Sequence, residues 1–249
     1  MMPILAFANL LENGSVVASS EDADFPVENA FDWRTSDWFK PATSGTVNID
    51  LTLSGSESAD YFAFYGHDLY AHSGTIKLQW WDGGGWVDCF AAVTPDDNSP
   101  RVITFNAQTS DKWRVVITCT GVFSIAVLSF GEALAVERGM YMGWTPPKYG
   151  RETEIIDSTS DGGEFLGRSI IAHGVKTTLE INKASEAWME ANWLGFVTVA
   201  EARPFFFLPD KARRPDDAVF AFTDGAIPTP TVTAVGFMSV SIPIRGMVE

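Results

Sequence analysis

Few residues of this chain are of the types and spacings that catalysis requires. Nucleophilic catalysis needs a Ser or Cys beside a His that an acid orients. The three histidines, His67, His72 and His173, stand beside no recognisable nucleophile signature, and no Gly-x-Ser-x-Gly sequence occurs. We therefore expect these histidines to be surface or core residues, and we expect the chain not to be an enzyme.

Acidic residues offer the next candidate chemistry. The sequence Pro-Asp-Asp occurs at Pro95–Asp97 and again at Pro215–Asp217. Paired acids bind Ca²⁺ or cleave glycosides, although adjacent acids in a polar loop are usually solvated turns. A glycosidase that uses Asp96 or Asp97 is one alternative. His67 and His72 match no zinc spacing, so we expect no metal and no cofactor.

Glycine and cysteine add no reactive motif. Gly83 to Gly85 lie between two strand-like runs and open no helix, which favours a hairpin turn over a phosphate-binding loop. Cys89 and Cys119 are too few and too far apart for a metal cluster or a disulfide framework. Each lies in an apolar run, so we expect two buried free thiols.

The stretch from Glu28 to Phe39, "ENAFDWRTSDWF", packs two Trp and two Phe among four charged residues. Such a loop either binds a ligand or fills a core. "RPFFFLPD" raises a similar question, because in a strand Phe205 and Phe207 face one side and Phe206 the other. A strand that is apolar on both faces needs cover on both, either from its own core or from a second subunit.

Charge and hydropathy exclude several partners. The chain has 32 acidic and 17 basic residues, a net charge of -15, which disfavours nucleic acid and anionic lipid. The one basic cluster, Lys211, Arg213 and Arg214, is flanked by acids and suits an inter-subunit salt-bridge rim. No run approaches eighteen apolar residues, so we expect no membrane insertion. The sequence begins without a secretory signal pattern, so synthesis in a cytoplasm is expected.

These residues must be positioned mainly by strands. Residues 46–53, 75–81 and 113–119 alternate apolar and polar side chains, and turn signals separate them, which predicts a β-sandwich over residues 1–137. Pro146 and Pro147 mark a linker over 138–152.

A smaller β-rich domain with one helix is expected over 153–249. Asn182 or Ser185 caps that helix, with Ala187, Ala191 and Leu194 on one stripe, and it ends before Pro204.

The first half resembles a discoidin domain, the coagulation-factor type C member of the galactose-binding-like jelly rolls. The resemblance rests on residues 18–39, on Asp50-Leu51, on the hairpin before Trp86 and on the paired runs 112–119 and 123–134. It implies that Ala30, Phe31 and Trp38 pack in the core. Trp33 stands where the family usually has glycine, so an exposed indole is expected there. Trp33, Arg34 and Asp37 are therefore the candidate glycan or partner contacts.

The second half, over residues 164–210 and 216–246, resembles the distal-tail and baseplate proteins of long-tailed bacteriophages. This resemblance implies a structural virion protein of a tail tip, made in the host cytoplasm. It also implies a ring, hexameric by family analogy, that contacts other tail proteins and carries an outward sandwich for neighbours or host glycans. Phe205, Phe207, Arg213 and Arg214 are the candidate inter-subunit contacts. The alternative is a non-catalytic carbohydrate-binding protein.

Overall fold

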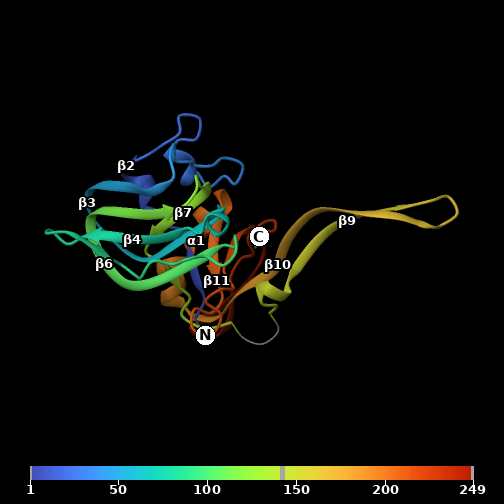
Figure 1. The fold of residues 1–249 in the computed structure, drawn as a ribbon. Helices are drawn as coiled ribbons and strands as arrows, with labels where there is room; N and C mark the ends of the chain where they lie inside the picture. The colour runs from blue at the N-terminus through green and yellow to red at the C-terminus, as the bar shows by residue number, and fades with distance from the viewer. Residues whose placement is uncertain (1, 141–143, 248–249) are drawn as a thin grey trace.

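The computed structural model describes residues 2–140 and 144–247, with the backbone alone for residues 171–173. The chain is mainly β, as predicted, with two sheets and one α-helix in this part (Figure 1). The strands are β1 (Ile4–Ala6), β2 (Ser15–Ala18), β3 (Gly45–His67), β4 (Thr75–Trp81), β5 (Trp86–Asp88), β6 (Arg101–Cys119), β7 (Ile125–Gly131), β8 (Leu134–Ala135), β9 (Arg151–Thr159), β10 (Phe165–Ser185), β11 (Phe205–Leu208), β12 (Val219–Thr223), β13 (Thr231–Ala234) and β14 (Phe237–Met247).

The smaller sheet forms the β-sandwich and has the order β2-β3-β6-β4-β5, with β7 paired to β3. The alternation in residues 46–53 is confirmed, because Val47, Ile49 and Leu51 are buried in the sandwich core. The β3–β6 register shifts between Thr52 and Glu57, and such irregularities let long strands bend. The two strands can thereby contribute to both layers of the sandwich.

The larger sheet has the order β8-β1-β11-β12-β14-β10-β9, and β13 pairs with β14. Two of its strands come from the start and the end of the first half, since β1 pairs with both β8 and β11. No local pattern in the sequence predicts this pairing. The proposed boundaries at 137 and 152 stay a prediction, but the stretch 1–137 supplies strands to both sheets.

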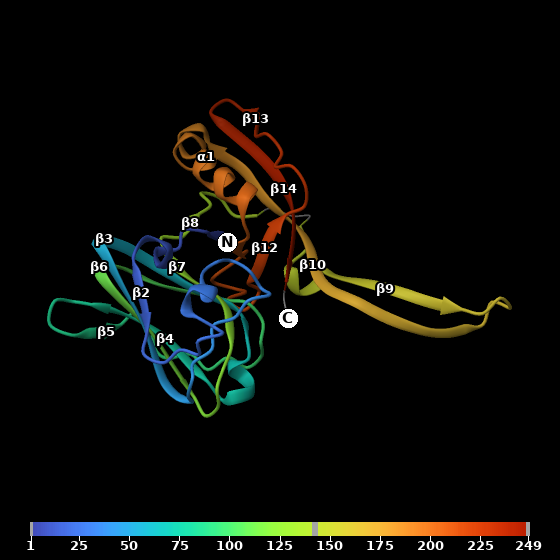
Figure 2. The same ribbon diagram turned by 90° about the horizontal axis from the view of Figure 1, so that it is seen from above.

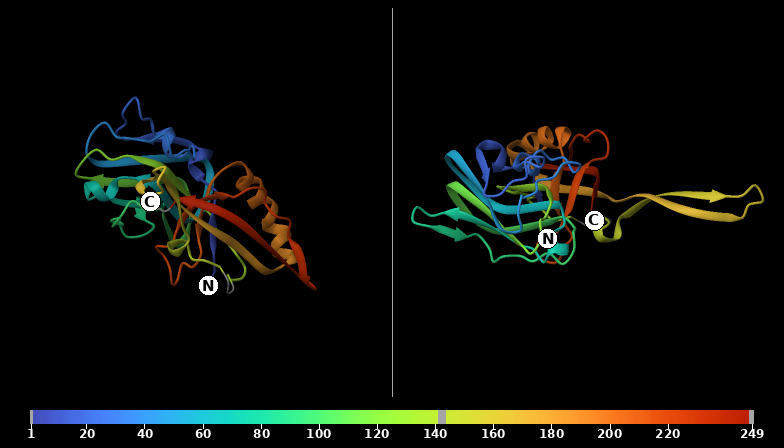
Figure 3. Two further views of the ribbon diagram at one scale, coloured as in Figure 1. Left: turned by 90° about the vertical axis from the view of Figure 1, so that its right-hand side faces the viewer. Right: turned by 45° about the horizontal axis from the view of Figure 1, so that its top comes forward.

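A shared layer of apolar side chains joins the two sheets. On β3, Tyr61 and Ala63 point away from the sandwich core and pack with Phe206 and Phe220 of the larger sheet. The neighbouring Phe62 and Phe64 lie in the sandwich core. This half of β3 is therefore covered on both faces, and Figure 3 shows the two sheets lying against each other.

The helix α1 (Glu186–Ala202) covers the larger sheet (Figure 2). Ser185 is the N-cap, as one of the two predictions had it, and its hydroxyl accepts a hydrogen bond from the Trp188 amide at 3.2 Å. The predicted stripe is wrong, because Ala187, Ala191 and Leu194 are all exposed. Met189, Phe196 and Ala200 form the buried face instead.

The glycine run forms a local turn, and the two cysteines are free thiols. Asp82 accepts hydrogen bonds from the amides of Gly84 and Gly85, both at 2.8 Å, so the glycine run is the predicted hairpin turn. Cys119 is a buried free thiol and Cys89 a half-buried one. Burial raises the pKa of Cys89 to about 12 and that of Cys119 to about 11. No helix of the described residues has the length and apolar character needed to cross a bilayer.

Candidate functional site

The two tryptophans of the loop Glu28–Phe39 have the opposite exposures to those predicted. Trp33, expected as an exposed indole, is only 7 % exposed, whereas Trp38, expected in the core, is 39 % exposed. The expected core position of Ala30 is confirmed, and Phe31 packs against the core while half-buried. The loop therefore buries one of its tryptophans and leaves the other exposed.

Trp33 is covered because its backbone turns it toward the larger sheet. Its φ of 66° lies in the left-handed region, which agrees with glycine being usual there in the resembled family. The indole stacks on Phe220 with ring centroids 6.3 Å apart, and the Arg203 guanidinium lies 4.7 Å from the ring. Its Nε1 donates to the Glu12 carboxylate, which Arg203 also contacts. An indole covered in this way has no free face for a sugar, so its role as a glycan contact is wrong.

Trp38 lies at one end of the sandwich, where three segments meet. Phe39 and Ile125 exchange backbone hydrogen bonds of 2.9 and 3.1 Å. The Ser124 amide donates to the Asp68 carboxylate at 2.7 Å. These bonds hold loop 19–44, the 3-10 helix Leu69–His72 and loop 120–124 side by side. We call this set of segments the loop end.

The loop end displays aromatic and polar side chains together. Tyr70 is 58 % exposed, and the Lys40 ammonium lies 5.6 Å from the Trp38 ring and 4.1 Å from the Phe25 ring. The His72 imidazole lies 3.7 Å from the Asp68 carboxylate. Exposed aromatic faces beside hydrogen-bonding groups are what a sugar ring requires, because its C–H face packs on an aromatic and its hydroxyls bond to polar groups.

Sequence reasoning missed Tyr70, Lys40 and His72 as parts of one site. The signal for Tyr70 was a tyrosine among polar residues in the short segment "HDLYAH" that follows a strand. Arg34 and Asp37, the other predicted contacts, are exposed on the same loop as Trp38 and lie 3.6 Å apart. Their role as contacts stays a prediction.

Gly121 shows how closely the segments of the loop end approach each other. A Cβ built on Gly121 would lie 2.5 Å from Nδ1 of His72. Only glycine lets loop 120–124 pass this near the imidazole. The Thr120 amide also donates to the His72 carbonyl at 3.1 Å, which fixes the backbone of His72 beside the loop.

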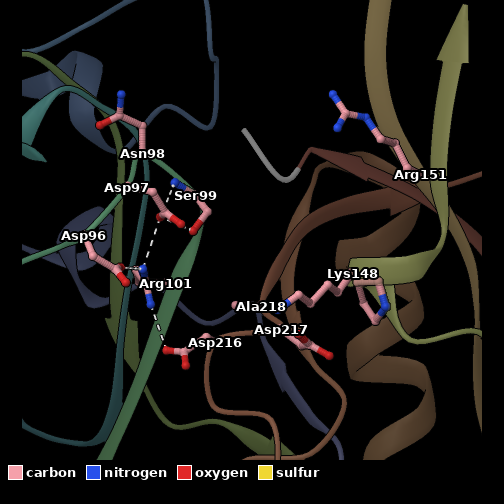
Figure 4. A pocket seen from close by; sticks show the side chains of 11 residues that line it. Asp96, Asp97, Asn98, Ser99, Arg101, Lys148, Arg151, Asp216, Asp217 and Ala218 are labelled. Atoms are coloured by element: carbon pink, nitrogen blue, oxygen red, sulfur yellow. Dashed lines mark hydrogen bonds and ion pairs between the residues drawn. The ribbon is translucent and has the colours of Figure 1, made fainter.

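A second polar cluster lies where the sandwich meets the larger sheet (Figure 4). Arg101, on β6, is 13 % exposed at its side chain and contacts Asp96, Asp97 at 3.1 Å and Asp216 at 2.8 Å. Partial burial tends to raise the pKa of Asp97, but hydrogen bonds from Ser99 and the charge of Arg101 outweigh it and hold that pKa below its usual value. Asp97 is therefore ionised near neutral pH and is unsuited to donate a proton to a leaving group.

The histidines and acids form no metal site in the described side chains. Among them, no group of three or more His, Cys, Asp or Glu side chains is arranged to hold a metal ion. His67 is buried against Phe64, and this burial lowers its pKa to about 4, so it is neutral near pH 7. The side chain of His173 lies outside the described residues.

The predicted inter-subunit residues divide into two groups. Phe205 and Phe207 are fully buried in the core of the larger sheet, and Phe206 faces the shared layer between the sheets. Their own chain covers both faces of β11, so their prediction as inter-subunit contacts is wrong. Arg213 is exposed, and Arg214 pairs with Asp217 at 3.0 Å. Their prediction as contacts stays open.

No protein-family model matches this chain, and no curated protein matches it either. Several solved structures are similar to half of it. CpGH89CBM32-5 from Clostridium perfringens, in complex with GalNAc-β-1,3-galactose, is 19 % identical over 50 % of this chain and 99 % of that chain, with a TM-score of 0.43. A chitosan-binding module of a chitosanase/glucanase from Paenibacillus sp. IK-5 is 25 % identical over 49 % and 98 %, with a TM-score of 0.42.

The family 32 carbohydrate-binding module of C. perfringens NanJ, in complex with galactose, is a third such structure. It is 16 % identical over 51 % of this chain and 98 % of that chain, with a TM-score of 0.42. These modules have the galactose-binding-like sandwich that the first half of the sequence resembles. Likenesses of this size assign no ligand to this chain.

Proposed function

We propose that this chain is a non-catalytic carbohydrate-binding protein whose binding site is the loop end of the sandwich. The observation that carries the proposal is the exposure of Trp38 and Tyr70 on hydrogen-bonded segments, with Lys40 beside Trp38 and His72 beside Asp68. In this role Trp38 stacks on the apolar face of a sugar ring. Lys40 and His72 donate hydrogen bonds to its hydroxyls.

The absence of catalysis is part of the proposal and rests on the carboxylates. A glycosidase needs one carboxyl group that is protonated near neutral pH and a second that is not. In the cluster around Arg101, hydrogen bonds and a cation favour the charged form of Asp97. This cluster instead links β6 to the loop before β12, where it contributes to holding the two sheets together.

A second candidate is a structural component of a phage tail tip, which residues 164–210 and 216–246 resemble in sequence. The observation that favours an assembly role is a long exposed hairpin, β9 and the first part of β10, that extends beyond the body of the molecule. In such a virion protein, the sugar-binding loop end would face host glycans. The ring, its hexameric order and its tail partners belong to this candidate.

The test is glycan binding by the purified full chain. A glycan array identifies ligands, and isothermal titration calorimetry then compares the wild-type chain with Trp38→Ala and Tyr149→Ala. Tyr149 is an exposed aromatic far from the loop end in the sequence, 69 % exposed against 39 % for Trp38, and serves as the control. We expect Trp38→Ala to weaken binding by about tenfold or more, as loss of an aromatic contact of about 1.5 kcal/mol requires, and Tyr149→Ala to leave it unchanged. Equal weakening by both variants, or no ligand on a broad array, would contradict the proposal.

A further inference from the structure

The hairpin of residues 151–170, which we call the arm, packs little against the rest of the chain. Its strands belong to the larger sheet, but it extends beyond the body of the molecule (Figures 1 and 3), and nearly all of its side chains are exposed. Among the described residues β9 pairs with β10 alone, so its outer edge is open. A two-stranded ribbon is marginally stable by itself, and an open edge offers unpaired backbone groups to another strand.

One face of the arm carries an apolar stripe. The strand register places Ile155 opposite Ile170, and Phe165 opposite Thr159 on the same face. Phe165 is 64 % exposed, and both isoleucines are exposed as well. The Asp157–Arg168 ion pair, at 2.7 Å, lies between the Ile155–Ile170 and Thr159–Phe165 pairs and stabilises this register. Water therefore contacts three large apolar side chains that a partner strand would partly cover.

Charge differs between the two ends of the arm. Asp161 and Glu164 make the tip acidic, while Lys148 precedes the root of the arm beside the exposed ring of Tyr149. Asp161 at the tip of one arm and Lys148 at the root of another are complementary in charge, while Glu152 and Glu154 also lie near the root. Lys148 and Tyr149 lie on the 3-10 helix Pro147–Tyr149 directly before β9, so two copies lying antiparallel would make this contact twice.

We propose that the arm is a homodimer interface in which β9 of one copy pairs antiparallel with β9 of a second copy, about a two-fold axis at Ile155. In this register Glu154 lies opposite Ile156, Glu152 opposite Ser158 and Asp157 opposite Thr153. Moving the register by one residue in either direction brings Asp157 opposite Glu154 or Glu152, and like charges directly opposite destabilise a pair.

The same register joins the apolar stripes of the two copies. Residues directly opposite in a sheet share a face, so Ile170 and Ile155 of one copy continue into Ile155 and Ile170 of the other. Asp161 of each tip then lies beside Tyr149 and Lys148 of the other root. Because the contact uses the same strand from both copies, it closes at two subunits and leaves no further open edge on either β9.

The proposal goes beyond carbohydrate binding and is tested by mass in solution. Analytical ultracentrifugation of the full chain over a wide concentration range should show a reversible species of twice the 27.2 kDa chain mass. Ile155→Glu brings two glutamates together on the axis, and we expect it to weaken dimerisation by roughly 100-fold. Val235→Glu makes the same change at an exposed side chain in the β13–β14 turn, and it should leave the dimer intact.

A charge exchange tests the tip-to-root contact separately. Asp161→Lys should weaken the dimer, and adding Lys148→Glu should restore most of the loss. Ile155, Asp161 and Lys148 are exposed, so circular dichroism and the melting temperature should show that every variant remains folded. A wild-type chain that stays monomeric at all concentrations, a larger oligomer, or a dimer that Ile155→Glu leaves unchanged would each overturn the proposal.

Discussion

Two substitutions of Trp33 should separate the contribution of its buried side chain to stability from the cost of its left-handed backbone. The indole is almost fully buried between the two sheets, where it stacks on Phe220 and donates to Glu12. Truncating a buried tryptophan to alanine costs about 3–5 kcal/mol of the free energy of unfolding. We expect Trp33→Ala to fall in this range because the cavity would lie where the sheets meet.

Trp33→Gly should be less harmful than Trp33→Ala, although it removes more atoms. A φ of 66° costs a non-glycine residue about 1–2 kcal/mol, and alanine keeps that cost while glycine avoids it. Glycine loses about 0.5–1 kcal/mol more conformational entropy on folding, so the net advantage of glycine is about 0–1.5 kcal/mol, centred near 0.75 kcal/mol.

The assay is urea unfolding followed by circular dichroism at one fixed protein concentration. The exposed Trp38→Ala serves as the control and should change the free energy of unfolding by less than about 1 kcal/mol. If Trp33→Ala lowered the free energy of unfolding as little as Trp38→Ala, the packing of Trp33 between the sheets would not be important for stability. If alanine were as stable as glycine at this position, the argument from backbone conformation would fail.

Two further predictions concern stability. The folded-state pKa of His67 is lowered by burial to about 4 from 6.5, so between these values the unfolded chain binds more protons and stability must fall as the pH falls. The free energy of unfolding should drop by up to about 1.4 kcal/mol per pH unit from pH 6.5 toward pH 4, and a His67→Gln variant that kept the same slope would disprove the assignment. Ser185→Ala removes the cap of α1 and should cost about 1 kcal/mol in thermal unfolding, whereas Ser185→Asp should restore most of it; equal losses in both would refute the capping role.

The strands and the helix were largely predictable because their signals are local. Alternation over residues 75–81 matches β4, and Ser185 marks the start of α1 because a hydroxyl there can accept an amide hydrogen bond. Contacts between distant segments left no such signal. β1 is three residues long, and only its pairing with Phe206 and Phe207 shows that it belongs to the larger sheet.

The proposed site uses the loop that the sequence indicated, but its exposed tryptophan is Trp38 and not Trp33. Whether an indole is covered depends on what lies over it, and the cover of Trp33 comes from Phe206 and Phe220, far along the chain. The left-handed backbone at Trp33 was indicated by the glycine usual at that position, yet the direction in which it turns the side chain was not. Lys40 is close to Trp38 in the sequence, but the segment of Tyr70 meets the Trp38 loop only through folding.

The most direct test of carbohydrate binding at the loop end is a glycan titration of the full chain labelled with ¹⁵N at its tryptophan indoles. The Trp38 Nε1–H signal, assigned with Trp38→Phe, should shift saturably with an array-selected glycan, while the buried Trp33 signal stays in place. A saturable shift of other tryptophans with Trp38 unmoved, or no shift of any signal with the best array ligand, would contradict this account.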